Sequence, residues 1–186
     1  RLSQMKNHLI STSKFLSLIL RHRPETIGLK LDPNGWVEIA TLIEAARQHG
    51  TPIELDLLLQ VVYENDKQRC ALSDDGLKIR ANQGHSVEVD LELTATRPPA
   101  VLYHGTVARF LDSIREQGLL AGSRQFVHLS SDRHTAEIVG KRRGSPVILI
   151  VRAESMFEHH HEFFLSRNGV WLTQHVGPEY LEFPDR

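Results

Sequence analysis

The spacing of apolar residues changes near residue 69, and this change limits the folds that the chain can adopt. Before it, apolar side chains recur at intervals of three and four, which is the period of a helix. The helices predicted in this way cover residues 13–22, 38–49 and 54–65. After it, residues 69–73 and 77–81 flank an Asp-Asp-Gly turn, which indicates a β-hairpin. Three helices followed by a hairpin are typical of a winged-helix unit.

Strands and helices alternate in the second half of the chain. Strands are predicted at 101–104, 126–130 and 146–151, helices at 107–117 and 133–141, and a hairpin at 163–173 around Arg167-Asn168-Gly169. Thr94–Pro99, which ends in two prolines, reads as a linker between two lobes. We therefore expect an α+β protein with one lobe at residues 1–93, a linker at 94–99 and a second lobe at 100–186.

Composition restricts the partners and the cellular compartment that we expect for the chain. It carries 22 Lys and Arg against 23 Asp and Glu, so any contact with nucleic acid must come from a local patch. The single cysteine, Cys70, cannot form an internal disulfide, which favours a reducing compartment. No apolar run approaches the roughly 20 residues of a membrane span. We expect a cytoplasmic monomer that does not contact a membrane.

Two groups of motifs combine Arg and His in places that suit an anionic ligand. Arg21 and His22 close the first helix, where cations either stabilise the helix end or line a cleft. His104 and His128 each follow apolar residues of a predicted strand, and Tyr103–Thr106 is expected at a strand end that faces a helix N-terminus. Both histidines could instead be satisfied within the core. These residues indicate a phosphorylated ligand without naming a reaction.

The histidine tract Glu158–Glu162 looks at first like a metal site. Three consecutive histidines point in different directions in a helix and alternate in a strand, and no second group of ligands has suitable spacing. We interpret the tract as a polar surface loop and expect no metal.

Seven short motifs, taken in order, resemble those of the KptA-type RNA 2′-phosphotransferases. They are Ser13–His22, Asp66–Arg69, Ile79–Ser86, His104–Thr106, Arg124–Ser130, Val139–Arg142 and Asn168–Leu172. Each piece is weak by itself, but seven in register are specific, and the resemblance runs from about residue 11 to about residue 181. The chain departs from the usual residues at Cys70, Phe126 and Arg143.

The resemblance implies a winged-helix-like RNA-binding lobe followed by a lobe similar to ADP-ribosyltransferases, with a split β-sheet that binds NAD⁺. It also implies a reaction in which an internal RNA 2′-phosphate is passed to ADP-ribose. The products expected from it are an RNA 2′-hydroxyl, ADP-ribose 1″,2″-cyclic phosphate and nicotinamide. NAD⁺ is then a co-substrate, and an RNA that carries a 2′-phosphate is the partner.

The resemblance also assigns roles to residues of this chain. The catalytic set maps onto Arg21, His22, Arg69 and Arg124. The residues expected to contact NAD⁺ are His104, Gly105, Thr106, His128, Ser130 and Arg142. Gln83, Gly84, His85 and Ser86 are expected to line the substrate cleft. A three-position signature of ADP-ribosyltransferases falls on His104, His128 and Val170. Its third position is usually a glutamate. Val170 cannot act as a base, which suits a nucleophile that is already an anion.

Two alternatives remain open on the sequence. A related transferase would use the same site to place ADP-ribose on a terminal phosphate of RNA or DNA. A winged-helix protein without catalytic activity would bind unmodified duplex, but the first lobe is nearly neutral, which does not favour that reading.

Overall fold

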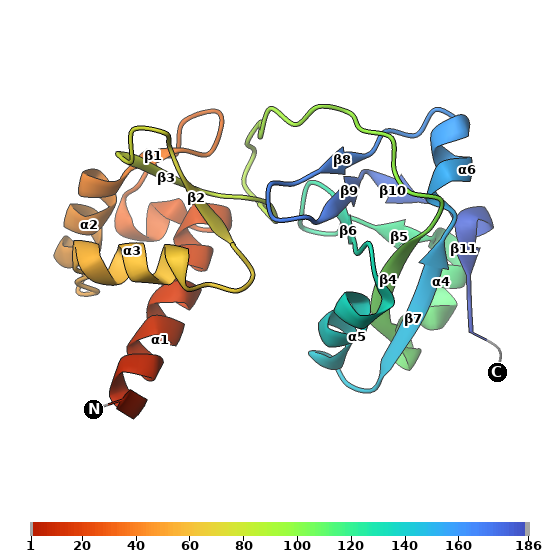
Figure 1. Ribbon diagram of the computed structural model, residues 1–186, viewed down its shortest axis with the longest axis horizontal. Coiled ribbons are helices and arrows are strands. Elements are labelled where there is room, and N and C mark those ends of the chain that lie inside the picture. Colours follow the sequence, from red (N-terminus) through yellow and green to blue (C-terminus); the bar gives the residue numbers. More distant parts are fainter. Residues whose placement is uncertain (1, 185–186) are drawn as a thin grey trace. The chain divides into compact units, whose positions relative to one another are not determined.

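The computed structural model describes residues 2–184, and the chain divides into two compact units, Arg1–Glu92 and Leu93–Arg186 (Figure 1). Both units mix helices with short antiparallel strands, so the expectation of a mixed α and β protein is confirmed. Within the part of the chain that the structure describes, no helix combines the length and apolar character that crossing a membrane requires.

The N-terminal unit contains three α-helices and one small sheet. Its elements are α1 (Leu2–Arg21), η1 (Pro24–Ile27), β1 (Val37–Glu38), α2 (Ile39–Gln48), α3 (Leu55–Tyr63), β2 (Cys70–Leu72) and β3 (Lys78–Ala81). The strands pair antiparallel in the order β1-β3-β2. The three predicted helices and the hairpin are all present, and the assignment of this unit to the winged-helix class stays a prediction.

The first helix starts well before the predicted position. Ser11, Thr12 and Ser13 offer capping oxygens, which suggested a start near residue 13, but all three lie inside α1. Ser11 Oγ instead donates to the carbonyl of His8 one turn earlier, at 3.0 Å. A hydroxyl side chain can bond back to its own helix as readily as it can cap one. The end of the helix is as predicted, because Pro24 follows Arg21 closely and cannot continue it.

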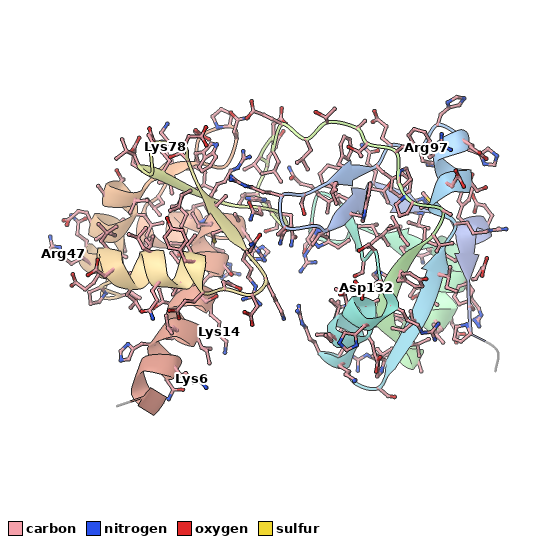
Figure 2. The ribbon with its side chains drawn as sticks, viewed as in Figure 1. Lys6, Lys14, Arg47, Lys78, Arg97 and Asp132 are labelled. Carbon is pink, nitrogen blue, oxygen red and sulfur yellow. The ribbon has the colours of Figure 1, made fainter. Side chains whose placement is uncertain are left out.

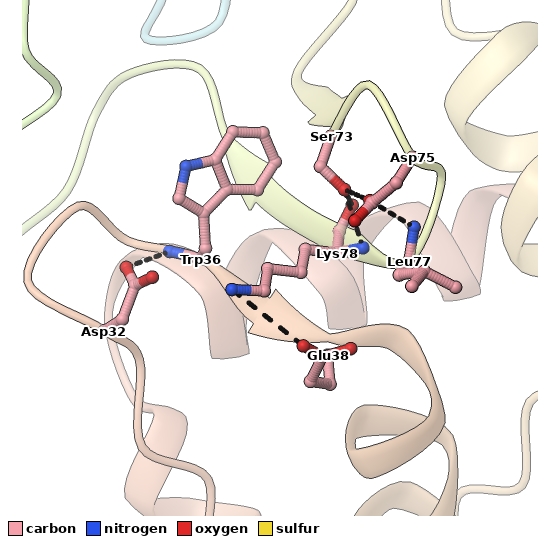
Figure 3. Close-up of polar contacts among 7 residues, drawn as sticks. All are labelled: Asp32, Trp36, Glu38, Ser73, Asp75, Leu77 and Lys78. Atoms are coloured by element: carbon pink, nitrogen blue, oxygen red, sulfur yellow. Dashed lines mark hydrogen bonds and ion pairs between the residues drawn. The ribbon is translucent and has the colours of Figure 1, made fainter.

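Side-chain bonds hold the two turns that shape the small sheet (Figure 3). Asp32 Oδ1 accepts from the backbone N–H of Trp36 at 2.8 Å. In the hairpin turn, Asp75 Oδ1 accepts from Ser73 Oγ at 2.5 Å and from the backbone N–H of Leu77 at 3.0 Å. Such local bonds replace ladder bonds where the chain reverses, so strand β3 enters the sheet in one register.

The C-terminal unit is built from three small antiparallel sheets. Its elements are β4 (Leu102–Val107), η2 (Ala108–Phe110), α4 (Leu111–Gln117), β5 (Leu119–Leu120), β6 (Val127–Leu129), α5 (Arg133–Lys141), β7 (Pro146–Val151), α6 (Ala153–Glu158), β8 (Phe164–Leu165), β9 (Trp171–Thr173), β10 (His175–Val176), η3 (Pro178–Tyr180) and β11 (Leu181–Glu182). The sheets have the orders β11-β7-β4, β6-β9-β8 and β10-β5. A bridge between Tyr103 and Ser130, with two hydrogen bonds of 2.9 Å, links β4 to β6. The assignment of this unit to the ADP-ribosyltransferase fold stays a prediction.

One prediction about this unit needs correction, and another stays a prediction. In segment 94–99, predicted as a linker, the N–H of Thr96 donates to the carbonyl of Phe163 at 2.8 Å and Arg97 pairs with Glu154 at 2.7 Å; its role as a linker stays a prediction. Tyr103–Thr106, expected at a strand end, lies inside β4, because pairing with β7 extends the strand to Val107.

Helix α5 lies directly on strand β4, and two glycines make this contact possible (Figure 1). A Cβ atom on Gly105 would lie 1.8 Å from the carbonyl oxygen of Ala136. A Cβ atom on Gly140 would lie 2.9 Å from Cβ of Pro146 and 3.1 Å from the carbonyl oxygen of Thr106. The backbones of helix and strand therefore touch without side chains between them.

We predict that Gly105→Ala lowers the free energy of unfolding by about 3 kcal/mol or more, because its methyl group would overlap the backbone of α5. Gly122→Ala is the matched control. It has φ +65° but nothing within 4 Å of the added Cβ, so it should cost only about 1 kcal/mol. Urea unfolding followed by circular dichroism measures both, and equal losses for the two variants would contradict this account of the contact.

Candidate active site

The end of α1 is tied to the loop that follows the hairpin. The carbonyl of Arg21 accepts from the backbone N–H groups of Ser86, at 2.8 Å, and Val87, at 3.3 Å. The next residue, His22, contacts Ser86 Oγ through Nδ1 at 2.9 Å. Carbonyls at a helix C-terminus lack partners within the helix, so this loop satisfies one of them. Arg21, His22 and Ser86 are thereby held in one place.

Arg69 joins the same region from the start of the hairpin. Its carbonyl accepts from the N–H of Asn82 at 2.9 Å and faces Nη2 of Arg21 at 3.5 Å. Its own Nη1 donates to Ser13 Oγ on α1 at 3.4 Å. Three of the four predicted catalytic residues therefore gather with the predicted cleft residues. We call this group the N-terminal cluster: Arg21, His22, Arg69 and Gln83–Ser86.

His85 is the most unusual member of the N-terminal cluster. Its side chain is 1% exposed, and among the described residues neither ring nitrogen has a hydrogen-bond partner. Burial, and then the positive charges of Arg21, His22 and Arg80, lower its pKa to about 4. The ring is therefore neutral at pH 7 although cations surround it, which leaves the positive charge of the cluster on the arginines.

Cys70 lies between the same arginines but is not a nucleophile at neutral pH. Burial raises the pKa of its thiol to about 11, and the charges of Arg21 and Arg69 offset this only in part. Because the thiolate is the reactive form of cysteine, the group stays an inert thiol in the hairpin.

The fourth predicted catalytic residue, Arg124, lies in the C-terminal unit beside two of the predicted NAD⁺ contacts. Its Nη1 donates to Nδ1 of His128 at 3.1 Å. In turn the carbonyl of His128 accepts from Nδ1 of His104 at 3.2 Å. We call Arg124, His128 and His104, with Arg142 and Arg143, the C-terminal cluster.

These contacts fix how each histidine of the C-terminal cluster carries its proton. A carbonyl oxygen only accepts, so Nδ1 of His104 carries the proton and its Nε2 is an acceptor. A guanidinium only donates, so Nδ1 of His128 is an acceptor and its Nε2 carries the proton. Burial lowers the pKa of His104, and Arg143 adds to this, which keeps that ring neutral. The two rings therefore present opposite hydrogen-bonding groups.

Three arginines concentrate positive charge in the C-terminal cluster. Burial lowers the pKa of Arg124, and the charges of Arg143 and Arg142 lower it further. Like charges at close range raise each other's energy unless an anion lies between them. This grouping suits a ligand with phosphate groups.

The remaining predicted cofactor contacts have structural roles. Gly105 is covered by α5, Thr106 is 2% exposed, and Ser130 pairs with Tyr103 through its backbone. Val170 directly precedes β9, and its N–H donates to Ser166 Oγ at 3.0 Å. The predicted roles of these residues toward a ligand stay predictions.

The histidine tract lies at the surface, as predicted, and two of its rings contact Tyr180. His159 Nδ1 contacts the hydroxyl of Tyr180 at 2.7 Å, and the ring of His161 meets that of Tyr180 edge-on. Within residues 2–184 no group of three or more His, Cys, Asp or Glu side chains is placed to hold a metal ion.

Sequence reasoning did not assign three residues that the structure places in or beside the clusters. Ser13 had been interpreted as a cap, whereas its hydroxyl accepts from Arg69 and from Asn65. Arg80 Cζ lies 4.5 Å from the centroid of the Trp36 ring, and the charge of Arg80 helps to lower the pKa of His85. Arg143 was noted as part of a basic cluster at a helix end and as a departure from a family pattern, but was given no role. The alternation along 78–81 could have pointed to Arg80, because it places Arg80 on the face opposite the buried Ile79.

Comparison with known proteins identifies the family. Residues 7–175 match the family described as "RNA 2'-phosphotransferase, Tpt1 / KptA family". The chain belongs to the Tpt1/KptA family. It is 57% identical over 177 residues to a protein of Rhodopirellula baltica named "Probable RNA 2'-phosphotransferase", with 95% of this chain and 96% of that protein covered.

Other relatives carry the same name. One from Flavobacterium johnsoniae is 54% identical, with 93% of this chain and 95% of the relative covered. One from Streptomyces coelicolor is also 54% identical, with 94% and 95% covered. The Tpt1/KptA match spans both units, so the N-terminal and C-terminal clusters both fall within the family region.

For this Tpt1/KptA member we predict that His85 makes stability depend on pH. In the unfolded chain a histidine binds its proton near pH 6.5, whereas His85 in the folded chain does so near pH 4. The free energy of unfolding should therefore fall, by about 3 kcal/mol, as the pH drops through that interval. Urea unfolding at several pH values should show a smaller drop for His85→Asn than for the wild type or for His8→Asn. Equal drops in all three proteins would refute the prediction.

We also predict opposite tautomers for the two histidines of the C-terminal cluster. ¹⁵N-detected imidazole spectra at pH 8 should show a protonated Nδ1 in His104 and a protonated Nε2 in His128. The reason is that Nδ1 of His104 faces a carbonyl oxygen, whereas Nδ1 of His128 faces a guanidinium. Arg124→Ala removes the donor to His128 and should alter only that ring. The same tautomer in both rings would rule out the hydrogen bonds described.

Proposed function

We propose that this chain removes an internal 2′-phosphate from RNA by transferring it to the ADP-ribose part of NAD⁺. The products are then RNA with a 2′-hydroxyl, ADP-ribose 1″,2″-cyclic phosphate and nicotinamide. The observation that carries this proposal is the gathering of Arg21, His22 and Arg69 around the end of α1, in a chain of the Tpt1/KptA family.

The N-terminal cluster suits the RNA 2′-phosphate. A phosphomonoester dianion is already a nucleophile and needs orientation more than a base. Arginine binds phosphate with two parallel N–H groups, which fixes both its position and its direction. Neutral His85 adds no further positive charge near Arg21. His22, held by Ser86 Oγ, can donate to the phosphate or move a proton to the RNA 2′-oxygen as that oxygen leaves.

The C-terminal cluster has the donor set that a dinucleotide needs. Its arginines can neutralise phosphate charge, and His104 Nε2 can accept from a ribose hydroxyl. When bound there, NAD⁺ would supply a ribose carbon open to attack and a nicotinamide leaving group. The task of the protein is then to bring the RNA phosphate to that carbon in line, which is catalysis by positioning.

After nicotinamide has left, the phosphate is transferred to the ribose in a second step, and this step depends more on the charge of the arginines. Attack of the ribose 2″-hydroxyl on the transferred phosphate builds negative charge as the RNA 2′-oxygen leaves. Fixed guanidinium groups stabilise such charge better in the transition state than in the ground state. We assign this role to Arg69 and Arg124, whose positions are set by Ser13 and His128.

We predict that Arg69→Ala and Arg124→Ala each slow turnover by about 10²–10³-fold, the usual cost of removing one such donor. Purified protein is mixed with NAD⁺ and RNA bearing one internal 2′-phosphate, and nicotinamide, RNA and nucleotide products are separated by chromatography. Arg69→Lys should recover only part of the rate, because lysine keeps the charge but not the two-pronged geometry.

The controls are exposed arginines outside both clusters, Arg47→Ala and Arg109→Ala, which should keep the wild-type rate. Wild-type protein that leaves the 2′-phosphate on the RNA would overturn the proposed function. Near-normal rates in both cluster variants would overturn only the roles given to Arg69 and Arg124.

A further inference from the structure

A pocket of about 420 Å³ opens beside Arg69 in the N-terminal unit. It lies between the middle of α1 and the end of α3 with the segment that joins α3 to β2. Its volume falls within the range of roughly 300–1,000 Å³ that is usual for ligand pockets. Arg69 is the only member of the N-terminal cluster on its wall, so the pocket adjoins the cluster without being part of it.

Part of the pocket lining is apolar. Leu9 and Ile10 of α1 and Val61 of α3 contribute to it, and Ile10 is 54% exposed. An exposed isoleucine alone needs no explanation, but one that lines a cavity with two partly or fully buried neighbours forms a surface on which a flat ring can lie. A nucleobase is such a ring.

Charged side chains lie beside the apolar ones, because Lys14 follows Ile10 by one turn on the same face of α1. Lys14 projects from α1 (Figure 2), and among the described side chains neither Lys14 nor Arg69 forms an ion pair with a carboxylate. The wall carries Lys14, Lys67 and Arg69 against Glu64 and Asp66, and so has a net charge of about +1. Glu64 also accepts from Gln60 Nε2 at 2.9 Å, which directs one of its oxygens along α3.

This combination of walls matches one nucleotide of a single strand. A nucleotide unit has one negative phosphodiester and one flat, largely apolar base, whereas a free phosphate or a polyphosphate would gain nothing from the apolar wall. Single-strand sites pair cations for the backbone with surfaces for base faces in the same way. The base edge can donate to the acidic groups on the rim.

We infer that this pocket holds a nucleotide that flanks the 2′-phosphorylated nucleotide of the RNA, with its phosphodiester at Lys14 and its base on Ile10. The inference rests on the proposed function, because Arg69 connects the pocket to the phosphate-binding cluster. It specifies which side chains contact the flanking nucleotide and so determine the preference for an oligonucleotide over an isolated nucleoside 2′-phosphate.

The test compares binding of two probes by isothermal titration calorimetry with the full chain. One probe is a ribotrinucleotide with a 2′-phosphate on its central residue, and the other is the matching nucleoside 2′-monophosphate. The wild type should bind the trinucleotide about tenfold more tightly. Lys14→Glu and Ile10→Glu should abolish that preference and leave the affinity for the mononucleotide unchanged.

Matched controls are Lys30→Glu and Leu77→Glu, which make the same changes at exposed positions of the same unit outside the pocket. Both should keep the preference. Lys14→Glu should also reduce the slope of log affinity against log salt concentration by about 0.7, the value for one phosphate of a single strand. An unchanged slope would contradict the contact between Lys14 and a phosphodiester.

The outcomes separate the two proposals. If wild-type protein turns over 2′-phosphorylated RNA but Lys14→Glu and Ile10→Glu keep the preference, the pocket inference alone is overturned. If the preference is present and lost in these variants while no RNA is turned over, the proposed function fails and the pocket stands. A wild type with no preference for the trinucleotide overturns the inference directly.

Discussion

The carbonyl of Arg21 is the point on which the N-terminal unit organises its site. It closes α1, and it accepts from the loop of residues 83–87 at the other end of the unit's sequence. Without that bond the last turn of the helix would present its carbonyls to water and the loop would have no anchor. The bond therefore holds the end of α1 and the loop in a fixed position relative to each other. From this helix end the side chain of Arg21 reaches the carbonyl of Arg69, and that of His22 contacts Ser86 Oγ.

Electrostatics in both units follow one pattern. Each cluster groups arginines around a histidine that burial keeps neutral, His85 in one unit and His104 in the other. A neutral imidazole among cations adds no repulsion and fills space that water would otherwise occupy. The arginines thus keep their charge for a ligand while the cluster avoids part of the energy of assembling like charges.

Elements with a clear apolar pattern could be predicted from the sequence, apart from the start of α1, whereas isolated two-residue strands could not. Helix 133–141 and strand 146–151 have the predicted bounds, because each contains a full period of apolar residues. Strands β1, β5, β10 and β11 contain two residues each and carry no periodic signal. Their pairing is decided by tertiary contacts that a local pattern does not contain.

The residues of the candidate site could be named from the sequence, but their contacts could not. The order of the Arg and His motifs supports the resemblance that names these residues, and their roles stay predictions; Gln83–Ser86 by itself indicates only a loop. The sequence does not show that His85 is buried without a hydrogen-bond partner, or that Ser13 accepts from Arg69 instead of capping a helix. Both depend on contacts between side chains more than 50 residues apart. Spacing along the chain does not encode such encounters.

The glycine contact between α5 and β4 has a mechanical consequence. Because neither Gly105 nor Gly140 leaves room for a methyl group, the helix cannot slide or roll along the strand without a collision of main-chain atoms. Helix α5 and strand β4 therefore move as one rigid body. Arg142 and Arg143, which follow the last turn of α5, keep a set spacing from the ring of His104 on β4, so thermal motion of this part of the unit carries cations and imidazole together.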